Sequence, residues 1–138
     1  MKNNPLLDYE VNPKIILAGL WTSVMFCYIY GDYFELYTPN KLRSLLDNTS
    51  TLNTPIYLLL ASILMAIPSL MISFSLILKP KFNRILNIIF GVIYTIIMVL
   101  IAISTFGTAW QEFYFLYAII ESVLTSIIVW RAFNWSRN

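Results

Sequence analysis

One acidic residue lies deep inside an apolar stretch of this sequence, and its type and position are those of a proton or cation site. Glu121 is eight positions into the apolar run 113–133, and a segment of that length crosses the hydrocarbon core of a membrane once. A charged side chain at the centre of a bilayer costs several kcal/mol, so intramembrane acids face protein or water and often mark ion pathways. No basic residue lies at that depth in the other apolar runs. We therefore expect a neutral carboxyl at pH 7 unless a bound cation or water compensates.

Hydroxyl groups share the helical face of Glu121. At 100° per residue this face includes Tyr114, Tyr117 and Thr125, whose hydroxyl groups can hydrogen-bond the carboxyl. The functional interpretation is a proton-binding or ligand-binding site at Glu121. The alternative is that a neutral Glu121 bonds a tyrosine, an asparagine or a backbone carbonyl of a neighbouring helix and only stabilises packing.

A second stripe of side chains runs along the first apolar stretch and ends in acids. It consists of Trp21, Met25, Tyr28, Asp32 and Glu35. Aromatic walls that end in acids favour an organic cation, which makes Tyr28 and Asp32 candidate ligand-binding residues. The alternative is that Asp32 lies where the helix emerges into water and is simply a solvated acid.

Two further residues interrupt apolar runs. Asn87 is a candidate for lining a cavity or, alternatively, for bonding another helix. Pro68 lies in mid-span, where it removes one backbone hydrogen bond and frees the carbonyl near Leu64. We expect a kink there, and Pro68 is the candidate hinge.

The overall composition excludes several classes of function. Of 138 residues, 59% are hydrophobic and 12% are charged, against roughly 25% charged in ordinary soluble domains. The chain has no histidine and one cysteine, Cys27, so it cannot form an internal disulfide or a thiolate and imidazole metal site. A formal charge of +2 without a basic face argues against nucleic-acid binding. We expect no metal site and no cofactor.

Four apolar runs and three cap signals predict the fold. The runs are 15–31, 56–78, 85–106 and 113–133. Asn12-Pro13 and Thr54-Pro55 each place a capping oxygen before a proline, which predicts two helix starts. A third signal, Thr38-Pro39, precedes leucines at positions 42, 45 and 46, which predicts a short amphipathic helix on the outer surface. We predict an all-α integral membrane bundle of four transmembrane helices, forming one domain over residues 1–138.

The distribution of basic residues predicts the orientation. Two of them, Lys41 and Arg43, lie on one side of the predicted membrane. Seven lie on the other side: Lys2, Lys14, Lys79, Lys81, Arg84, Arg131 and Arg137. By the positive-inside rule, both termini are expected in the cytoplasm.

Several short stretches resemble an uncharacterised family of small bacterial four-helix membrane proteins, loosely grouped as DoxX-like. These stretches are Leu20-Trp21-Thr22-Ser23-Val24-Met25-Phe26, Ile63-Leu64-Met65-Ala66-Ile67-Pro68, Asn87-Ile88-Ile89-Phe90-Gly91, and Ile119-Ile120-Glu121 followed by Trp130. The resemblance implies the fold and a bacterial cytoplasmic membrane, but no activity.

Three functional hypotheses follow. The first is a binding or transport protein for a proton, a cation or a small hydrophobic molecule, with Glu121 at its site. The second is a non-catalytic subunit that docks a membrane partner or forms a homo-oligomer through small-residue seams. The third, an enzyme acting on a lipid or quinone, ranks last because the usual nucleophile and base pairings are missing.

Overall fold

The structure, a computed structural model, describes residues 10–135 and contains five helices in that range. They are α1 (Pro13–Glu35), α2 (Lys41–Leu46), α3 (Pro55–Ile77), α4 (Pro80–Thr105) and α5 (Glu112–Phe133). All except α2 are long and apolar enough to cross a membrane, and the described range contains no strand. The predicted all-helical bundle with a short helix between the first two long ones is confirmed.

The predicted caps start two of the helices. The Asn12 side chain accepts a hydrogen bond from the Lys14 amide at 3.0 Å, and the Thr54 hydroxyl accepts one from the Tyr57 amide at 3.4 Å. Each cap is followed by a proline at the first helical position, whose missing N–H costs nothing there. These sequence signals fix the helix starts at Pro13 and Pro55.

Two other boundaries differ from the predicted apolar runs by several residues. α4 starts at Pro80 rather than at residue 85, because its polar first turns lower the local hydropathy without preventing helix formation. α1 continues to Glu35 rather than stopping at residue 31. The short helix α2 is preceded by Asn40 in the left-handed conformation, with φ of 65°, so it starts after Asn40 rather than at Thr38-Pro39.

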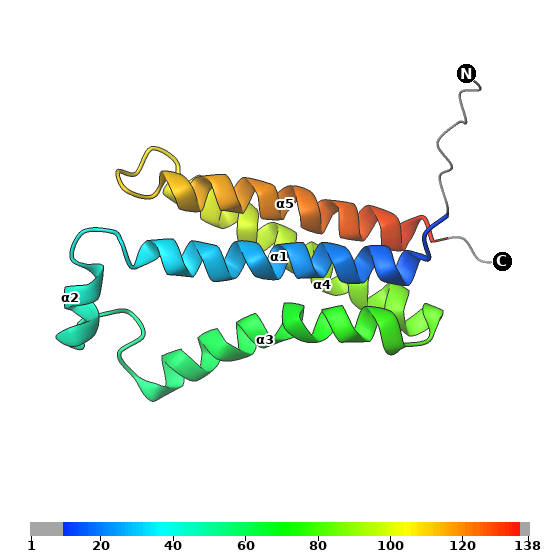
Figure 1. The fold of residues 1–138 in the computed structure, drawn as a ribbon, viewed down its shortest axis with the longest axis horizontal. Coiled ribbons are helices and arrows are strands. Elements are labelled where there is room, and N and C mark those ends of the chain that lie inside the picture. The colour runs from blue at the N-terminus through cyan, green and yellow to red at the C-terminus, as the bar shows by residue number, and fades with distance from the viewer. Residues whose placement is uncertain (1–9, 136–138) are drawn as a thin grey trace, which may run out of the picture.

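The four long helices form a bundle with distinct ends. α1 lies between α3 and α5, and α4 packs closely along α5 (Figure 1). The end of the bundle that carries α2 and the α4–α5 loop is called the α2 end below. The opposite end, where the described chain starts and finishes, is called the basic end after its side chains: Lys14, Lys79, Lys81, Arg84 and Arg131.

The first half of α3 diverges from the bundle. Figure 1 shows α3 bending near its middle, and Pro68 lies in this region. From residue 55 to residue 60 every side chain is exposed, whereas Pro68, Met71 and Ser75 in the second half are buried. The bend therefore leaves α3 attached mainly through its second half.

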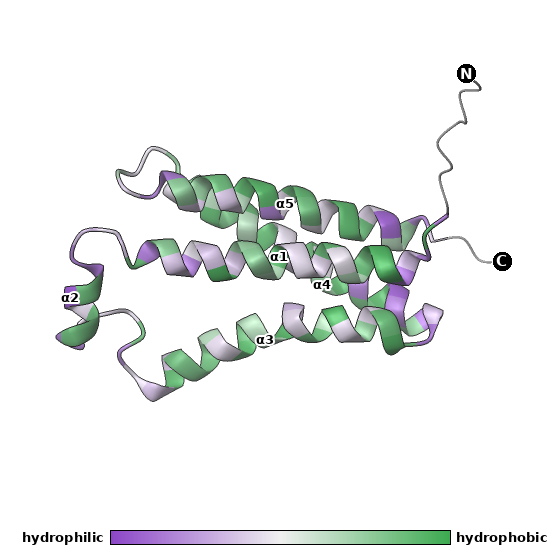
Figure 2. Cartoon of the chain, in the orientation of Figure 1, coloured by the Kyte–Doolittle hydropathy of each residue, from purple (hydrophilic) through white to green (hydrophobic). Residues whose placement is uncertain are grey.

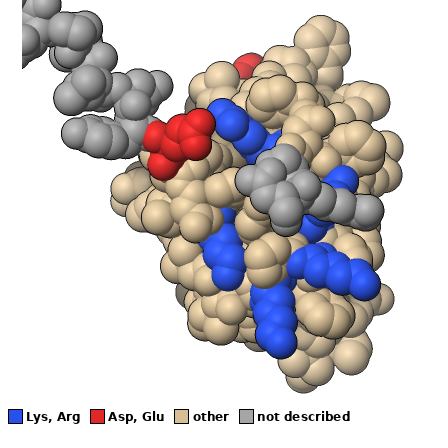
Figure 3. Space-filling model, turned by 90° about the vertical axis from the view of Figure 1, so that its right-hand side faces the viewer, with Lys and Arg blue, Asp and Glu red and all other residues tan. Residues whose placement is uncertain are grey.

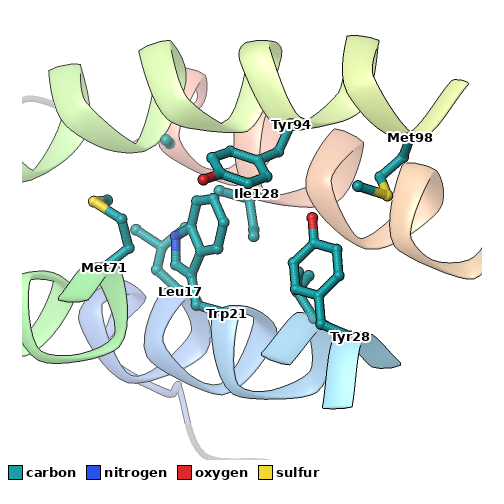
Figure 4. Packing of buried hydrophobic residues seen from close by; sticks show 9 residues of the cluster. Leu17, Trp21, Tyr28, Met71, Tyr94, Met98 and Ile128 are labelled. Carbon is teal, nitrogen blue, oxygen red and sulfur yellow. The ribbon is translucent and has the colours of Figure 1, made fainter. Parts of the chain in front are cut away.

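Buried aromatic residues form the core between α1 and α4. The Trp21 ring meets the Tyr94 ring edge-on, with centroids 5.9 Å apart, and the Tyr28 ring lies 6.4 Å from Tyr94 (Figure 4). The outward faces of the long helices are also largely apolar (Figure 2). Large apolar side chains such as Leu100 and Ile103 are 60% and 69% exposed, which is the expected pattern where lipid is the solvent.

Several small residues recur along the long helices, and only some of them lie at contacts between helices of this bundle. A Cβ on Gly91 of α4 would come within 2.7 Å of Val129 on α5, so glycine allows these helices their close approach. Gly19 and Ser23 on α1 are exposed instead. The same holds for the small residues of α3: Ser62, Ala66, Ser69 and Ser73.

Candidate functional site

A cavity lies between α1, α4 and α5 in the half of the bundle nearest α2. Its volume is about 170 Å³, and Leu64 and Met65 of α3 form part of its wall. Glu121 lines this cavity together with Tyr28 and Tyr117. The structure thus brings three of the predicted candidates, from two helices, to one site.

Glu121 is buried and its carboxyl lacks a partner. Its residue surface is only 3% exposed. No hydrogen bond or ion pair within residues 10–135 involves the Glu121 carboxylate oxygens. A buried carboxyl normally has such partners, so Glu121 retains unused hydrogen-bonding capacity at the wall of the cavity.

Tyr28 supplies a second polar group without a partner. Its residue surface is 8% exposed, and its hydroxyl is buried with no hydrogen-bond partner in the described part of the chain. Figure 4 shows the ring extending from α1 toward α4 and α5. A phenol can donate one hydrogen bond and accept another, so Tyr28 and Glu121 together can bind a polar or cationic group.

Tyr94 completes the aromatic wall of the cavity and ties it to α3. Its hydroxyl donates a hydrogen bond to the Leu64 carbonyl. Leu64 precedes Pro68 by four residues, so this is the carbonyl that the proline leaves without a helical partner. The sequence predicted that this carbonyl would be free, and the structure shows that α4 supplies the donor.

The cavity extends from Glu121 toward the α2 end, where acids are held together. Asp32 and Tyr114 also line it. The Tyr114 hydroxyl lies 3.1 Å from one carboxylate oxygen of Asp32 and 3.1 Å from one of Glu35. Lys41 binds the other Glu35 oxygen at 2.5 Å. Tyr114 and Asp32 are therefore at the mouth of the cavity, within a hydrogen-bonded cluster.

Thr125, expected to bond the Glu121 carboxyl, lies outside the cavity. Its hydroxyl donates to the main-chain carbonyl of Glu121 at 2.8 Å and accepts from the Thr95 hydroxyl at 2.7 Å. The first of these hydrogen bonds lies within α5, and the second joins α5 to α4. Thr125 therefore links two helices and leaves the carboxyl of Glu121 unbonded.

Asn87 also lies apart from the cavity, toward the basic end, in a network of buried polar groups. Its amide oxygen accepts from the Trp21 indole N–H at 2.7 Å, and its amide nitrogen donates to the Asn83 side-chain oxygen at 2.6 Å. Asn83 in turn donates to the Ser75 carbonyl at 2.5 Å. The network joins α1, α3 and α4, which matches the alternative interpretation of Asn87 as a contact between helices.

Sequence reasoning missed Asn83 and Ser75. Asn83 is four residues before Asn87 and thus on the same helical face, a signal that was available. Ser75 had no signal, because its role depends on which turn of α3 approaches α4. Tyr94, which lines the cavity, is a third residue that the sequence analysis did not single out.

Over residues 10–135, the fold and the cavity define a class: a small all-helical bundle with four helices long and apolar enough to span a membrane, and with an acidic side chain, Glu121, in a cavity between them. Residues 4–138 match a family described as a family of unknown function, DUF6326, and the chain belongs to this family. No curated protein and no solved structure matches it. Membership in an uncharacterised family is confirmed, whereas the grouping with DoxX-like and bacterial proteins stays a prediction.

Proposed function

We propose that this chain is a membrane-embedded binding or transport protein that holds a proton or a small cation at Glu121. The observation that carries the proposal is the cavity that brings the Glu121 carboxyl and the Tyr28 hydroxyl together. Neither group has a hydrogen-bond or ion-pair partner among the described residues; the Tyr28 hydroxyl is buried, and the Glu121 residue is 3% exposed.

The free energy of the unpaired groups supports a ligand. A buried polar group without a hydrogen bond costs about 1–3 kcal/mol, and lipid offers no substitute for water. A chain that required only packing would be more stable with apolar side chains at both positions. A ligand that bonds both groups would offset the cost of keeping them.

The size and walls of the cavity restrict the ligand. At about 170 Å³ it is smaller than the sites of drug-sized molecules, which span about 300–1,000 Å³. Four tyrosines line it, Tyr28, Tyr94, Tyr114 and Tyr117, and aromatic faces attract cations through their quadrupoles. A small organic ammonium ion therefore suits the site, and a proton is the smallest occupant it can hold.

Entry from the α2 end is part of the proposal. The excess of Lys and Arg at the opposite end favours cytoplasmic termini, and with that orientation the mouth at Asp32 and Tyr114 would face the outer side. Pro68 is the proposed hinge, because the half of α3 before it diverges and is exposed. The hydrogen bond from the Tyr94 hydroxyl to the Leu64 carbonyl would break and re-form as that half of α3 moves.

Binding of tetramethylammonium to the purified protein tests the proposal. Wild type is expected to bind, and its affinity should fall as the pH is lowered because protons compete for the carboxylate. Glu121→Gln should weaken binding at least about thirtyfold, the usual effect of removing one partner of a buried charge pair. The measurement is isothermal titration in detergent at several pH values.

Glu112→Gln is the matched control. It makes the same change on the same helix, at an exposed position outside the cavity, and should bind like wild type. Equal affinities for wild type and Glu121→Gln, or equal losses in both variants, would contradict a site at Glu121.

A second candidate is a non-catalytic subunit that associates with a membrane partner or with another copy of itself. The specific observation is the exposed face of α3 that carries Ser62, Ala66, Ser69 and Ser73, since small residues let membrane helices approach closely. This role predicts a stable complex after gentle detergent extraction, and Glu121→Gln should leave that complex intact.

A further inference from the structure

A larger cavity lies at the basic end, apart from the Glu121 site. Its volume is about 1130 Å³, and its described lining comes from the start of α1, the start of α4 and the end of α5. Figure 3 shows this end of the molecule, with Lys and Arg side chains gathered on its face. None of the residues that line the Glu121 cavity lines this one.

Most of the charged residues that line this cavity in the described part of the chain are basic. Lys81, Arg84 and Arg131 line it, against one acid, Glu10. The ion pairs formed within residues 10–135 include none of the three basic side chains. Within the described part of the chain, their charges are therefore available to an anion.

Arg84 is held in position by contacts of its own. One guanidinium nitrogen donates to the Phe133 carbonyl at 2.8 Å, and the guanidinium carbon lies 5.8 Å from the centre of the Phe133 ring. These contacts use one side of a group that has five N–H donors. The remaining donors suit the oxygens of a phosphate, which the planar guanidinium binds in a two-pronged manner.

Apolar and amphipathic side chains form the rest of the wall. Trp130 and Trp135 line the cavity, and indole rings are enriched where the bilayer meets water. The apolar side chains Ile16, Ile85 and Ile88 line it as well. A ligand that matches this wall has an anionic head and an apolar body.

We propose that the cavity at the basic end binds an anionic phospholipid, with its phosphate at Arg84, Arg131 and Lys81 and its first acyl carbons against the isoleucines. Basic pockets between membrane helices bind anionic head groups in this manner. The site is independent of the cation site at Glu121. It would fix the ends of α1, α4 and α5 relative to the membrane surface.

Lipid binding to the full chain in detergent tests this proposal, read by native mass spectrometry and by melting temperature. Phosphatidylglycerol should bind wild type and raise its melting temperature, whereas phosphatidylcholine, with no net charge, should bind far less. Each basic group near an anionic head group contributes about fivefold in affinity, so Lys81→Gln with Arg131→Gln should weaken binding about thirtyfold.

The control variant removes the same number of charges elsewhere. Lys79→Gln with Arg43→Gln changes one residue of the basic end that does not line the cavity and one exposed residue of α2. It should bind phosphatidylglycerol like wild type. Both double variants leave Arg84 and its helix-to-helix contact intact, so folding is expected to be unaffected.

Three results would overturn the proposal. Equal losses in both double variants would show attraction by net charge alone. Equal binding of the two lipids would show that the anionic head is not recognised. The same stabilisation by inorganic phosphate without lipid would identify a soluble anion as the ligand.

Discussion

Two clusters of polar groups lie inside the same bundle and differ in whether their bonds are made. Around Asn87, the indole of Trp21 and the amide of Asn83 have partners at 2.6–2.7 Å. Within the described residues the Tyr28 hydroxyl has no partner, and no hydrogen bond or ion pair involves the Glu121 carboxyl. The polar groups of the first cluster are satisfied by hydrogen bonds between helices, whereas those of the second retain unused hydrogen-bonding capacity.

The two clusters also differ in how the helices around them pack. In lipid, an unpaired polar group cannot bond to water, so paired groups stabilise a particular packing. The Asn87 network joins α1, α3 and α4 on the side where α3 packs against the bundle. The Glu121 cavity lies where α3 diverges. The hydrogen-bonded polar contacts between helices are thus concentrated toward the basic end, whereas the half toward α2 contains the cavity with the unpaired groups.

The largest expected effect comes from breaking the Asn87 network. Asn87→Leu leaves the Trp21 indole N–H and the Asn83 amide oxygen buried without partners, and each such group costs about 1–3 kcal/mol. The free energy of unfolding should fall by about 3 kcal/mol, measured by detergent titration in mixed micelles. Asn53→Leu, in an exposed loop, should change it by less than about 0.5 kcal/mol. Similar losses in both would remove the distinction between the network and the surface.

A smaller loss in the free energy of unfolding is expected from a substitution at the close α4–α5 contact, which lies between the two clusters. In Gly91→Ala the new methyl lies 2.7 Å from a methyl of Val129, whose β-branched side chain has little rotamer freedom in a helix. Overpacking of this kind costs about 2 kcal/mol. Gly19→Ala meets no atom within 4 Å and should be neutral or stabilising. If both alanines are tolerated alike, the close contact does not hold the clusters at a fixed spacing.

The smallest effects compare two tyrosines that line the same cavity. Tyr94→Phe removes the donor to the Leu64 carbonyl and should lower the free energy of unfolding by about 1 kcal/mol. Tyr28→Phe removes a hydroxyl without a partner and should leave it unchanged or raise it slightly. Thermal unfolding in one detergent compares the pair directly. An equal loss of stability in both variants would mean that the Tyr28 hydroxyl is hydrogen-bonded, and that the polar groups of the cavity are satisfied like those around Asn87.

The sequence determined the four long helices and two of their starts. Apolar runs of about 20 residues can satisfy their backbone only as helices in lipid, and the caps at Asn12 and Thr54 act locally. Glu121 could also be identified as a candidate site residue from the sequence, because an ionisable residue within such a run is rare. The kink at Pro68 follows from its missing N–H.

Only the tertiary structure decided which faces meet. Because lipid and protein interior are both apolar, hydropathy does not specify how far each helix is rotated about its axis. That rotation placed Tyr28 and Glu121 on one cavity and directed Thr125 to Thr95 instead of to the carboxyl. It also brought Ser75 to Asn83. Such contacts depend on packing and on hydrogen bonds between residues far apart in the chain, and no local pattern records them.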